Sequence, residues 1–269
     1  MPQTHSGLAA ITQTFQRAKQ ERRATFMPFF TVGYPDLPTS IAVLQTLVEI
    51  GADALEIGMP FSDPLADGPT IQHASQVALQ RGTRLSDCLD AVRMLRERGV
   101  NVPLVMMGYL NPLLAYGLER FVSEAAQAGA SGFIVPDLPP EEAEEFSALC
   151  TAHRLGFTPL LAPNSTAERM AEVAKMARGF LYLVSVTGVT GARDSLPPDL
   201  TEYIARARAQ TDLPLAVGFG ISQPSQARQV AAHADGVIVA SALIRLMESE
   251  GLEAVRNLAA SLRAACVVE

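Results

Sequence analysis

The chain has 269 residues and a formal net charge of −7. Its length and its 48% hydrophobic content allow one large core, in a single barrel-type domain over residues 1–269. The acidic balance, without a basic stripe, argues against nucleic acid as a partner. No apolar run approaches the roughly 18 residues of a membrane span or follows the polar N-terminus as in a secretion signal, so a cytoplasmic protein is predicted.

The predicted elements begin with a helix over residues 8–22, where apolar residues recur with helical spacing. After a buried strand, one unit recurs: a helical stretch ends in a turn, and a short, mainly apolar run follows. Together these runs give eight predicted strands, at residues 26–32, 51–58, 103–107, 132–137, 157–164, 180–187, 213–220 and 236–241.

Amphipathic helical stretches lie between these strands. They cover residues 39–50, 85–98, 118–128, 141–154, 167–177, 199–210, 222–232 and 252–264. Near-continuous apolar strands that alternate with such helices indicate a parallel sheet covered on its outer face. Eight units favour an α/β fold of the closed (β/α)8 type, a TIM barrel with an extra N-terminal helix. An open doubly wound sheet remains the alternative, because strand order cannot be read from spacing.

Two carboxylates follow one another closely in this pattern. Glu56 lies between Leu55 and Ile57 in a short apolar strand, where alternation would place a core side chain. Asp67 lies in the next loop, just before a helical run at 70–80. One acid on a strand and one on a loop form a candidate general acid/base pair, and partial desolvation is expected to raise the pKa of Glu56. The alternatives are a structurally paired glutamate and a helix-capping aspartate.

The ends of the last two strands have the features of a phosphate site. Gly218 and Gly220 allow backbone N–H groups to approach a ligand, and Ser241 begins a short helical run at 242–247. In TIM barrels these two loops are the usual phosphate cradle. Glycines that serve only as turns, with Ser241 as a plain helix cap, are the alternative.

The remaining residue inventory excludes several mechanisms. The two lysines, Lys19 and Lys175, fall in predicted helices, so a Schiff-base aldolase is not expected. The four histidines are isolated and the three cysteines are far apart, so neither a metal site nor a disulfide framework is predicted. No cofactor is expected. If a carbon–carbon bond is cleaved, side chains only move protons and the substrate itself must accommodate the electrons.

The residues from Leu55 to Thr70 closely resemble the signature of the tryptophan synthase alpha subunit family. The likeness extends along nearly the whole chain, through residues 29–35, 109–112, 136–139, 182, 188–191 and 218–222. The resemblance implies a lyase that cleaves indole-3-glycerol phosphate to indole and glyceraldehyde 3-phosphate. It also implies an alpha2-beta2 heterotetramer, in which indole passes through a tunnel to a pyridoxal-phosphate-dependent beta subunit.

The same resemblance assigns roles to single residues. Glu56 matches the general acid/base that protonates the indole C3 and handles the glycerol hydroxyl proton, and Asp67 matches the carboxylate that hydrogen-bonds the indole N–H. The other implied substrate contacts are Phe29, Tyr109, Tyr182, Thr190, Gly191, Phe219, Gly220 and Ser241. Of these, Gly191, Gly220 and Ser241 would contact the phosphate. The implied contacts with the beta subunit are Pro60, Asp63, Asn111 and Pro139.

Two stretches depart from the family pattern. Ala240 stands where a glycine usually precedes Ser241, which bears on the phosphate cradle. Val186 and Thr187 replace an arginine and an alanine of some members, in the loop after the sixth predicted strand. Residues 188–191 of that loop are interpreted as a lid that orders over substrate, and a plain surface loop is the alternative.

Three functional hypotheses follow. The first is a lyase that works as one half of a bienzyme complex. The second is a free-standing lyase that produces indole without a partner. The third is a catalytically silent activator that binds ligand and regulates its partner, against which the intact acid pair argues.

Overall fold

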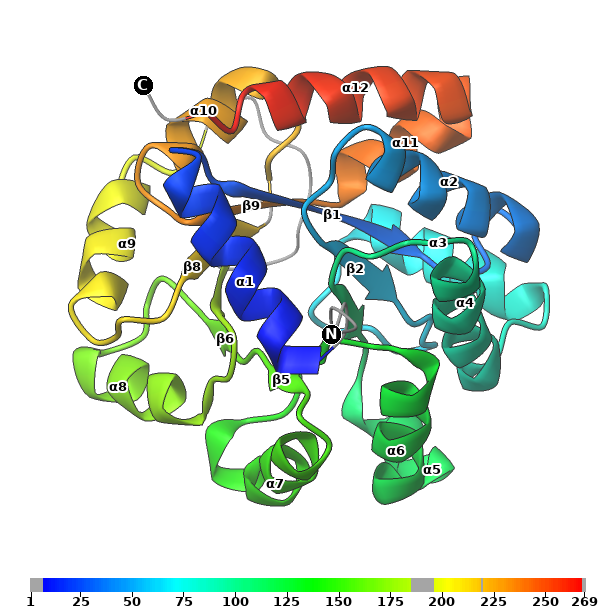
Figure 1. The fold of residues 1–269 in the computed structure, drawn as a ribbon, viewed down its shortest axis with the longest axis horizontal. Coiled ribbons are helices and arrows are strands. Elements are labelled where there is room, and N and C mark those ends of the chain that lie inside the picture. Colours follow the sequence, from blue (N-terminus) through cyan, green and yellow to red (C-terminus); the bar gives the residue numbers. More distant parts are fainter. Residues whose placement is uncertain (1–6, 185–195, 219, 268–269) are drawn as a thin grey trace.

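In the computed structural model, which describes residues 7–184, 196–218 and 220–267, nine parallel strands form one sheet. They are β1 (Thr25–Thr31), β2 (Leu55–Gly58), β3 (Leu104–Met107), β4 (Gly132–Ile134), β5 (Gly156–Phe157), β6 (Leu160–Leu161), β7 (Leu181–Val184), β8 (Leu215–Gly218) and β9 (Gly236–Val239). The strand order is β5-β4-β3-β2-β1-β9-β8-β7-β6, so the last strand pairs with the first (Figure 1). This order is that of a barrel and confirms the TIM-barrel prediction over an open doubly wound sheet.

The ring closes where β5 and β6 meet. These two short strands are the halves of the predicted strand at 157–164, and β5 pairs with β4 while β6 pairs with β7. Between them the Thr158 N–H donates to the Phe133 carbonyl at 2.9 Å, and the Tyr182 N–H donates to the Pro159 carbonyl at 3.3 Å. Pro159 lacks an N–H and interrupts the ladder, because proline can accept but cannot donate.

Most of the helices surround this barrel on its outside, and the first of them lies across one end (Figure 1). In the described residues they are α1 (Gly7–Gln20), α2 (Leu37–Glu49), α3 (Pro69–Gln80), α4 (Leu85–Glu97), α5 (Leu110–Tyr116), α6 (Leu118–Ala128), α7 (Glu144–Ala152), α8 (Ala167–Met176), α9 (Leu200–Arg208), α10 (Pro224–Ala231), α11 (Ser241–Glu250) and α12 (Leu252–Ala264), with a 3-10 turn, η1, at Pro140–Glu142. Outward-facing strand side chains pack against them: the rings of Phe133 on β4 and Phe146 on α7 are 5.4 Å apart.

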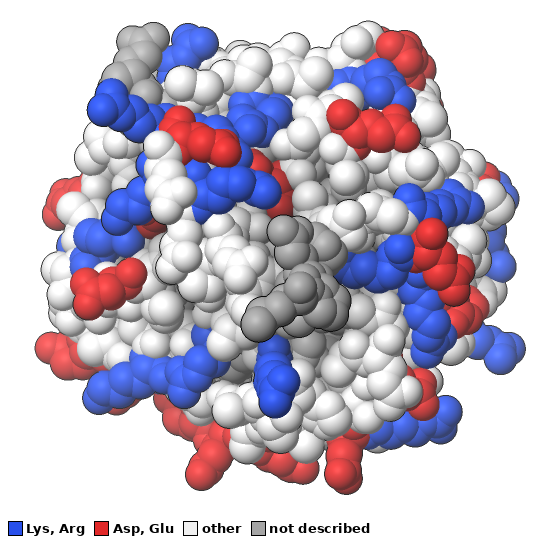
Figure 2. Space-filling model, viewed as in Figure 1, with Lys and Arg blue, Asp and Glu red and all other residues white. Residues whose placement is uncertain are grey.

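The first helix, α1, which the sequence predicts over residues 8–22, covers the N-terminal end of the barrel. Its first two N–H groups, on Gly7 and Leu8, donate to carbonyls of residues 130 and 154, just before β4 and β5. Farther along, the ring of Phe15 lies 5.3 Å from that of Phe180, just before β7. Basic and acidic side chains are interspersed over the face of the molecule that carries α1 (Figure 2). Because α1 covers the N-terminal end, the opposite end of the barrel is the one open to ligands.

Two helical regions differ from the sequence-based expectation. The helix α5, between β3 and α6, was not predicted, because seven residues are too few to show helical periodicity. The predicted helix at 141–154 divides into η1 and α7, with Ala143 between them. Both differences lie on the loops that follow β3 and β4, at the C-terminal end of the barrel.

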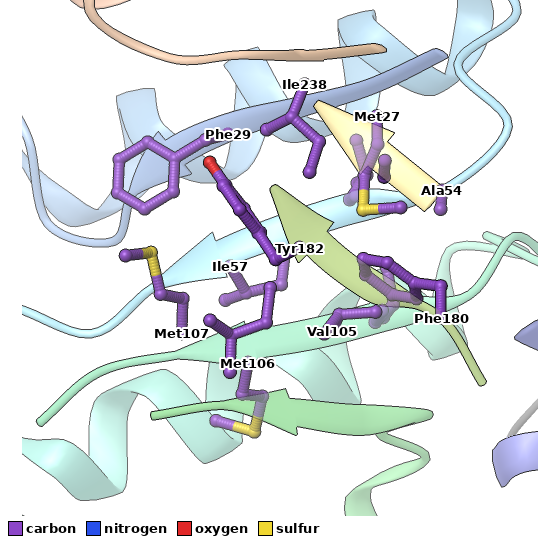
Figure 3. Close-up of a cluster of buried hydrophobic side chains, with 14 of the residues drawn as sticks. Met27, Phe29, Ala54, Ile57, Val105, Met106, Met107, Phe180, Tyr182 and Ile238 are labelled. Carbon is purple, nitrogen blue, oxygen red and sulfur yellow. The ribbon is translucent and has the colours of Figure 1, made fainter. Parts of the chain in front are cut away.

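The barrel interior is filled from several strands. In the registers of the sheet, Phe29 of β1 pairs with Glu56 of β2, and Glu56 pairs with Val105 of β3. Figure 3 shows Phe29, Met107 and Tyr182 converging from three different strands. Paired residues in parallel strands share a face, so Glu56 is placed inside an apolar layer. In the described part of the chain, no helix combines the length and the apolar composition that a membrane span needs.

Candidate active site

Glu56 is the central polar group of the barrel interior. Its side chain lies on β2, flanked in register by Phe29 and Val105, and is only 1% exposed. Neither of its carboxylate oxygens has a hydrogen-bond partner among the described residues. A buried carboxylate that lacks a partner is costly to the fold, so a structural pairing does not explain Glu56.

Asp67 reaches the same interior from the loop between β2 and α3. Its side chain is 5% exposed, and its Oδ1 has no hydrogen-bond partner among the residues that the structure describes. Its backbone is fixed, since its N–H donates to the Pro64 carbonyl at 3.0 Å and its carbonyl accepts from the Gln72 side chain at 2.9 Å. The N-cap of α3 is Gly68, without a side-chain cap, so Asp67 does not cap this helix.

Burial raises the pKa of both carboxyl groups. For Glu56, desolvation and then the charge of Asp67 raise the pKa to about 8. For Asp67, desolvation raises the pKa to about 7, against a hydrogen bond from Tyr109 that lowers it. Because the two groups repel as anions, they titrate as a pair. The pair therefore binds a proton near neutral pH, where an exposed carboxyl group would be ionised.

The acid pair and the proposed phosphate end share one cavity. It is lined by both carboxyl groups, by the side chains Phe29, Ile71, Met107, Tyr182, Ile221 and Ile238, and by the loop residues Gly220, Ala240 and Ser241. Of the predicted substrate contacts, Phe29, Tyr182, Gly220 and Ser241 are thus brought together with Glu56 and Asp67. The cavity offers a carboxyl pair in an apolar slot next to backbone that can bind an anion.

The phosphate end is built from the start of α11 and the turn after β8. Gly220 has φ +77°, a left-handed conformation, and nothing lies within 4 Å of the place of a Cβ there. Ala240 has φ −125°, so it does not lie in the left-handed region that favours the glycine usual at this position. The first N–H groups of α11 follow Ala240 and have no intrahelical acceptor, as at any helix start. They are suited to bind phosphate oxygens.

Tyr182 and Phe29 depend on glycines of the neighbouring strands. A Cβ on Gly218 of β8 would lie 2.0 Å from the Tyr182 hydroxyl, and one on Gly58 of β2 would lie 2.4 Å from the Phe29 ring. Burial first, and then the charges of Glu56 and Asp67, raise the pKa of Tyr182 well above its ordinary value, so this tyrosine stays neutral. Gly218 and Gly58 thus make room for aromatic side chains that line the cavity.

Replacement of Gly218 by alanine is expected to lower kcat/KM for indole formation by about 10²-fold, since Tyr182 must leave its place beside the acid pair. The added methyl group would overlap the Tyr182 ring, which is buried in the packed barrel. Steady-state kinetics, with circular dichroism to verify the fold, measure this effect. An alanine variant with the kinetics of the parent chain would show that Tyr182 has no fixed role.

Tyr109 lies beside this cavity but does not line it. Its hydroxyl accepts a hydrogen bond from the Ala66 N–H at 3.0 Å, and its ring faces that of Phe61. It lines the adjacent hollow beneath the β2–α3 loop, with Met59 and Leu113 among its neighbours. The structure therefore brings Tyr109 to the loop of Asp67, a contact that the sequence pattern does not indicate.

The other predicted positions divide into two groups. Thr190, Gly191 and Phe219 lie outside the described residues, as do Val186, Thr187 and the interpreted lid at 188–191. The predicted partner contacts all lie in the connections that follow β2, β3 and β4, with Asp63 and Asn111 exposed and Pro60 and Pro139 half-buried; Asn111 is in α5 and the others are on loops. In the same connections Leu65 is 91% exposed and Leu114, also in α5, is 52% exposed, and neither could be recognised from sequence because neither stands in a periodic pattern.

Comparison with known proteins gives one consistent result. A family model described as tryptophan synthase alpha chain matches residues 15–267. The tryptophan synthase alpha chain of Chloroflexus aggregans is 50% identical over 238 residues, which cover 88% of this chain and 89% of that protein. That of Geobacter sulfurreducens is 50% identical over 241 residues, covering 90% and 91%.

Solved structures agree with these sequence relatives. A chain of Mycobacterium tuberculosis tryptophan synthase superposes with a TM-score of 0.91 at 41% identity, over 96% of this chain and 98% of that one. The tryptophan synthase subunit alpha of Legionella pneumophila gives 0.88 at 40% identity, over 96% and 98%. The family inferred from residues 55–70 is therefore confirmed by proteins that match almost the full length. With this fold and this degree of identity, the chain belongs to the tryptophan synthase alpha chain family, the lyases of the alpha reaction in tryptophan biosynthesis.

Proposed function

We propose that Glu56 and Asp67 carry out the alpha reaction in this chain, the cleavage of indole-3-glycerol phosphate to indole and glyceraldehyde 3-phosphate. The observation that carries this proposal is the single cavity, in which two buried carboxyl groups with raised pKa values lie next to Gly220 and Ser241. Glu56, protonated near neutral pH, is the general acid. Asp67, the stronger acid of the pair, is the anion.

The chemistry balances with these two groups alone. Glu56 gives its proton to C3 of the indole ring, and Asp67 accepts the N–H of the ring as positive charge develops there. Glu56, now ionised, takes the proton of the hydroxyl on the adjacent glycerol carbon. The carbon–carbon bond then breaks, its electron pair returns to the ring, and the former alcohol carbon becomes the aldehyde. Glu56 ends protonated, ready for the next turnover.

Substrate orientation follows from the two ends of the cavity. The N–H groups at the start of α11 and the backbone at Gly220 are proposed to hold the phosphate, together with the Ser241 hydroxyl. Phe29 and Tyr182 are proposed to flank the indole ring in the apolar part. Thr190, Gly191, Phe219 and Tyr109 are assigned to the substrate by resemblance alone.

The rim of the same end is proposed to bind the beta subunit in an alpha2-beta2 heterotetramer, with indole channelled to it. Leu65, 91% exposed, lies on the loop that carries Asp63, and Leu114, 52% exposed, lies on the helix α5 that carries Asn111. Large exposed apolar side chains beside an active site support a docking surface for a partner. The single-domain organisation over 1–269 and the cytoplasmic location belong to the same proposal, and the free thiols Cys88, Cys150 and Cys266 suit a reducing compartment.

The test is indole formation by the purified chain, alone and with a tryptophan synthase beta subunit. We expect slow turnover by the chain alone and a stimulation of at least about tenfold by the partner, a coupling of ordinary size between two sites. Light scattering should give the mass of a heterotetramer. Equal rates with and without the partner would instead identify a free-standing lyase, and no indole in either sample would identify a silent activator.

A further inference from the structure

Tyr109 stands between the rim loops and the acid pair. We propose that it is a positioning residue for Asp67: its hydroxyl fixes the loop that carries this carboxylate, so that Asp67 faces Glu56 in the closed cavity. The inference rests on the catalytic roles proposed above for Glu56 and Asp67. It assigns to the Tyr109 hydroxyl a task distinct from contact with the indole ring.

The first support is the pair of contacts that Tyr109 makes with the β2–α3 loop. Its hydroxyl accepts from the N–H of Ala66, the residue directly before Asp67, at 3.0 Å. Its ring centroid lies 5.3 Å from that of Phe61, at the other end of the loop, with the rings tilted by 31°. Tyr109 itself is 4% exposed, so both contacts are shielded from water. One side chain thus holds the loop at two points.

The second support is that the loop has few other restraints. The bonds from Leu65 N–H to Asp63 and from Asp67 N–H to Pro64 are turns within the loop itself. In the described part of the chain, Tyr109 provides the hydrogen bond that ties residues 61–66 to another barrel loop. Leu65, 91% exposed, adds no packing. Without the Tyr109 hydroxyl, residues 61–66 keep only bonds that move with them, and the bond from the Gln72 side chain on α3 holds only the Asp67 carbonyl that follows.

The third support is that Tyr109 is itself held in place. The next N–H along the chain, that of Leu110, donates to Asp137 Oδ1 at 2.9 Å, which caps the start of α5 from the loop after β4. Tyr109 is the N-cap residue of this helix. The position of its ring is thereby set by β3, by α5 and by the neighbouring loop. A fixed ring can orient a loop that has little structure of its own.

The fourth support is electrostatic. The titratable groups facing Asp67 are Glu56 on β2, Tyr182 on β7 and Tyr109, with Asp137 behind Tyr109. The hydrogen bond from Tyr109 lowers the pKa of Asp67, against the burial that raises it to about 7. The hydroxyl therefore also favours the anionic Asp67 that the reaction needs.

The test is the variant Tyr109→Phe, which keeps the ring on Phe61 and removes only the hydroxyl. We expect kcat for indole formation to fall by about tenfold, the effect of one lost hydrogen bond, with little change in KM. We also expect the acidic limb of the pH profile of kcat/KM to move upward by about half a pH unit or more, because Asp67 loses the bond that favours its charge. Rates from pH 5.5 to 9.5 measure both effects.

The matched control is Tyr116→Phe. Tyr116 ends the helix α5 that Tyr109 caps, and its hydroxyl donates to the half-buried Glu124 at 2.5 Å. Its loss is expected to change neither kcat nor either limb of the profile. In Tyr109→Phe, an unchanged kcat overturns the proposal. A lower kcat with an unmoved acidic limb also overturns it, because that result assigns Tyr109 to general loop stability.

The outcome can be separated from that of the proposed function. If Glu56→Gln is inactive while Tyr109→Phe behaves as the parent chain, only the role of Tyr109 fails. If Glu56→Gln retains turnover, the acid pair itself is misassigned, whatever Tyr109→Phe does.

Discussion

Replacement of Glu56 by glutamine is expected to lower kcat for indole formation by about 10²–10⁴-fold, the usual contribution of a general acid or base. Glutamine keeps the shape of the side chain on β2 but can neither donate a proton to C3 of the ring nor accept one from the hydroxyl. Because Gly220 and Ser241 are untouched, glycerol 3-phosphate should bind with a similar Kd in calorimetry. Turnover near the parent rate would remove Glu56 from its proposed role.

The same variant is expected to be more stable than the parent chain at alkaline pH. The pKa of Glu56 is about 8 in the folded state against 4.5 as the model value. Between these values the folded chain binds a proton that the unfolded chain releases. The stability that this provides is fully present below pH 4.5 and is lost as the pH rises through about 8. Glutamine has no charge to bury and avoids this loss.

The size of the effect follows from the two pKa values. Their difference, between about 8 and 4.5, means that ionisation of Glu56 in the fold lowers the free energy of unfolding by at most about 5 kcal/mol at high pH. Relaxation of the site makes the loss smaller. We expect the free energy of unfolding of Glu56→Gln to be about 1–3 kcal/mol higher than that of the parent chain at pH 9, and to differ little from it at pH 5. Urea unfolding at both pH values measures it. A variant less stable than the parent chain at pH 9 would contradict a buried, protonated Glu56.

The fold was predictable from the sequence to the extent that it depends on local patterns. Apolar runs alternating with amphipathic helices identify the strands and the helices around them, because both periods are written into consecutive residues. Ring closure is different, since the contacts of Thr158 and Pro159 join residues distant in the chain. The helix α5 was not predictable because its seven residues are too few to show helical periodicity and because the side chain that caps its start, Asp137, comes from another loop.

The site was predictable where a residue type conflicts with its surroundings. Glu56 in an apolar strand and the glycine at position 220 after a strand end stand out in this way, and both line one cavity. Ile71 and Ile238 line it too, but no feature of the sequence distinguishes them from other buried apolar residues. The hydroxyl of Tyr109 could not be placed either, because its partner is a backbone N–H in a loop without periodicity.

A second large effect is expected at the opposite end of the barrel, around Asp53. This carboxylate, 3% exposed, precedes β2 and accepts from Arg23 Nη1 at 2.6 Å and from the Phe26 N–H at 3.0 Å. Arg17, at the end of α1, lies 3.4 Å away, and Arg263, at the end of α12, lies 3.7 Å away. The Arg23 side chain is 7% exposed, and its second partner, Glu21 at 2.6 Å from Nε, is 49% exposed, so Asp53 is its shielded counter-charge. Asp53 thus joins α1 and α12 to the first two strands.

Replacement of Asp53 by asparagine is expected to lower the free energy of unfolding by about 2–4 kcal/mol, because it leaves the Arg23 charge with only the half-exposed Glu21 as a partner. The total for a domain is about 5–15 kcal/mol, so this loss should be visible as a lower urea midpoint and a lower Tm.

Asp90→Asn is the control: its partner Arg93 is 42% exposed on α4, and loss of that surface pair should cost at most about 1 kcal/mol. Since Asp53 lies at the end of the barrel away from Glu56, kcat at 25 °C should stay near the parent value. Equal stability of the two variants would show that the Asp53 cluster is no stronger than a surface ion pair, and a loss of kcat in the folded Asp53 variant would show that the two ends of the barrel are coupled.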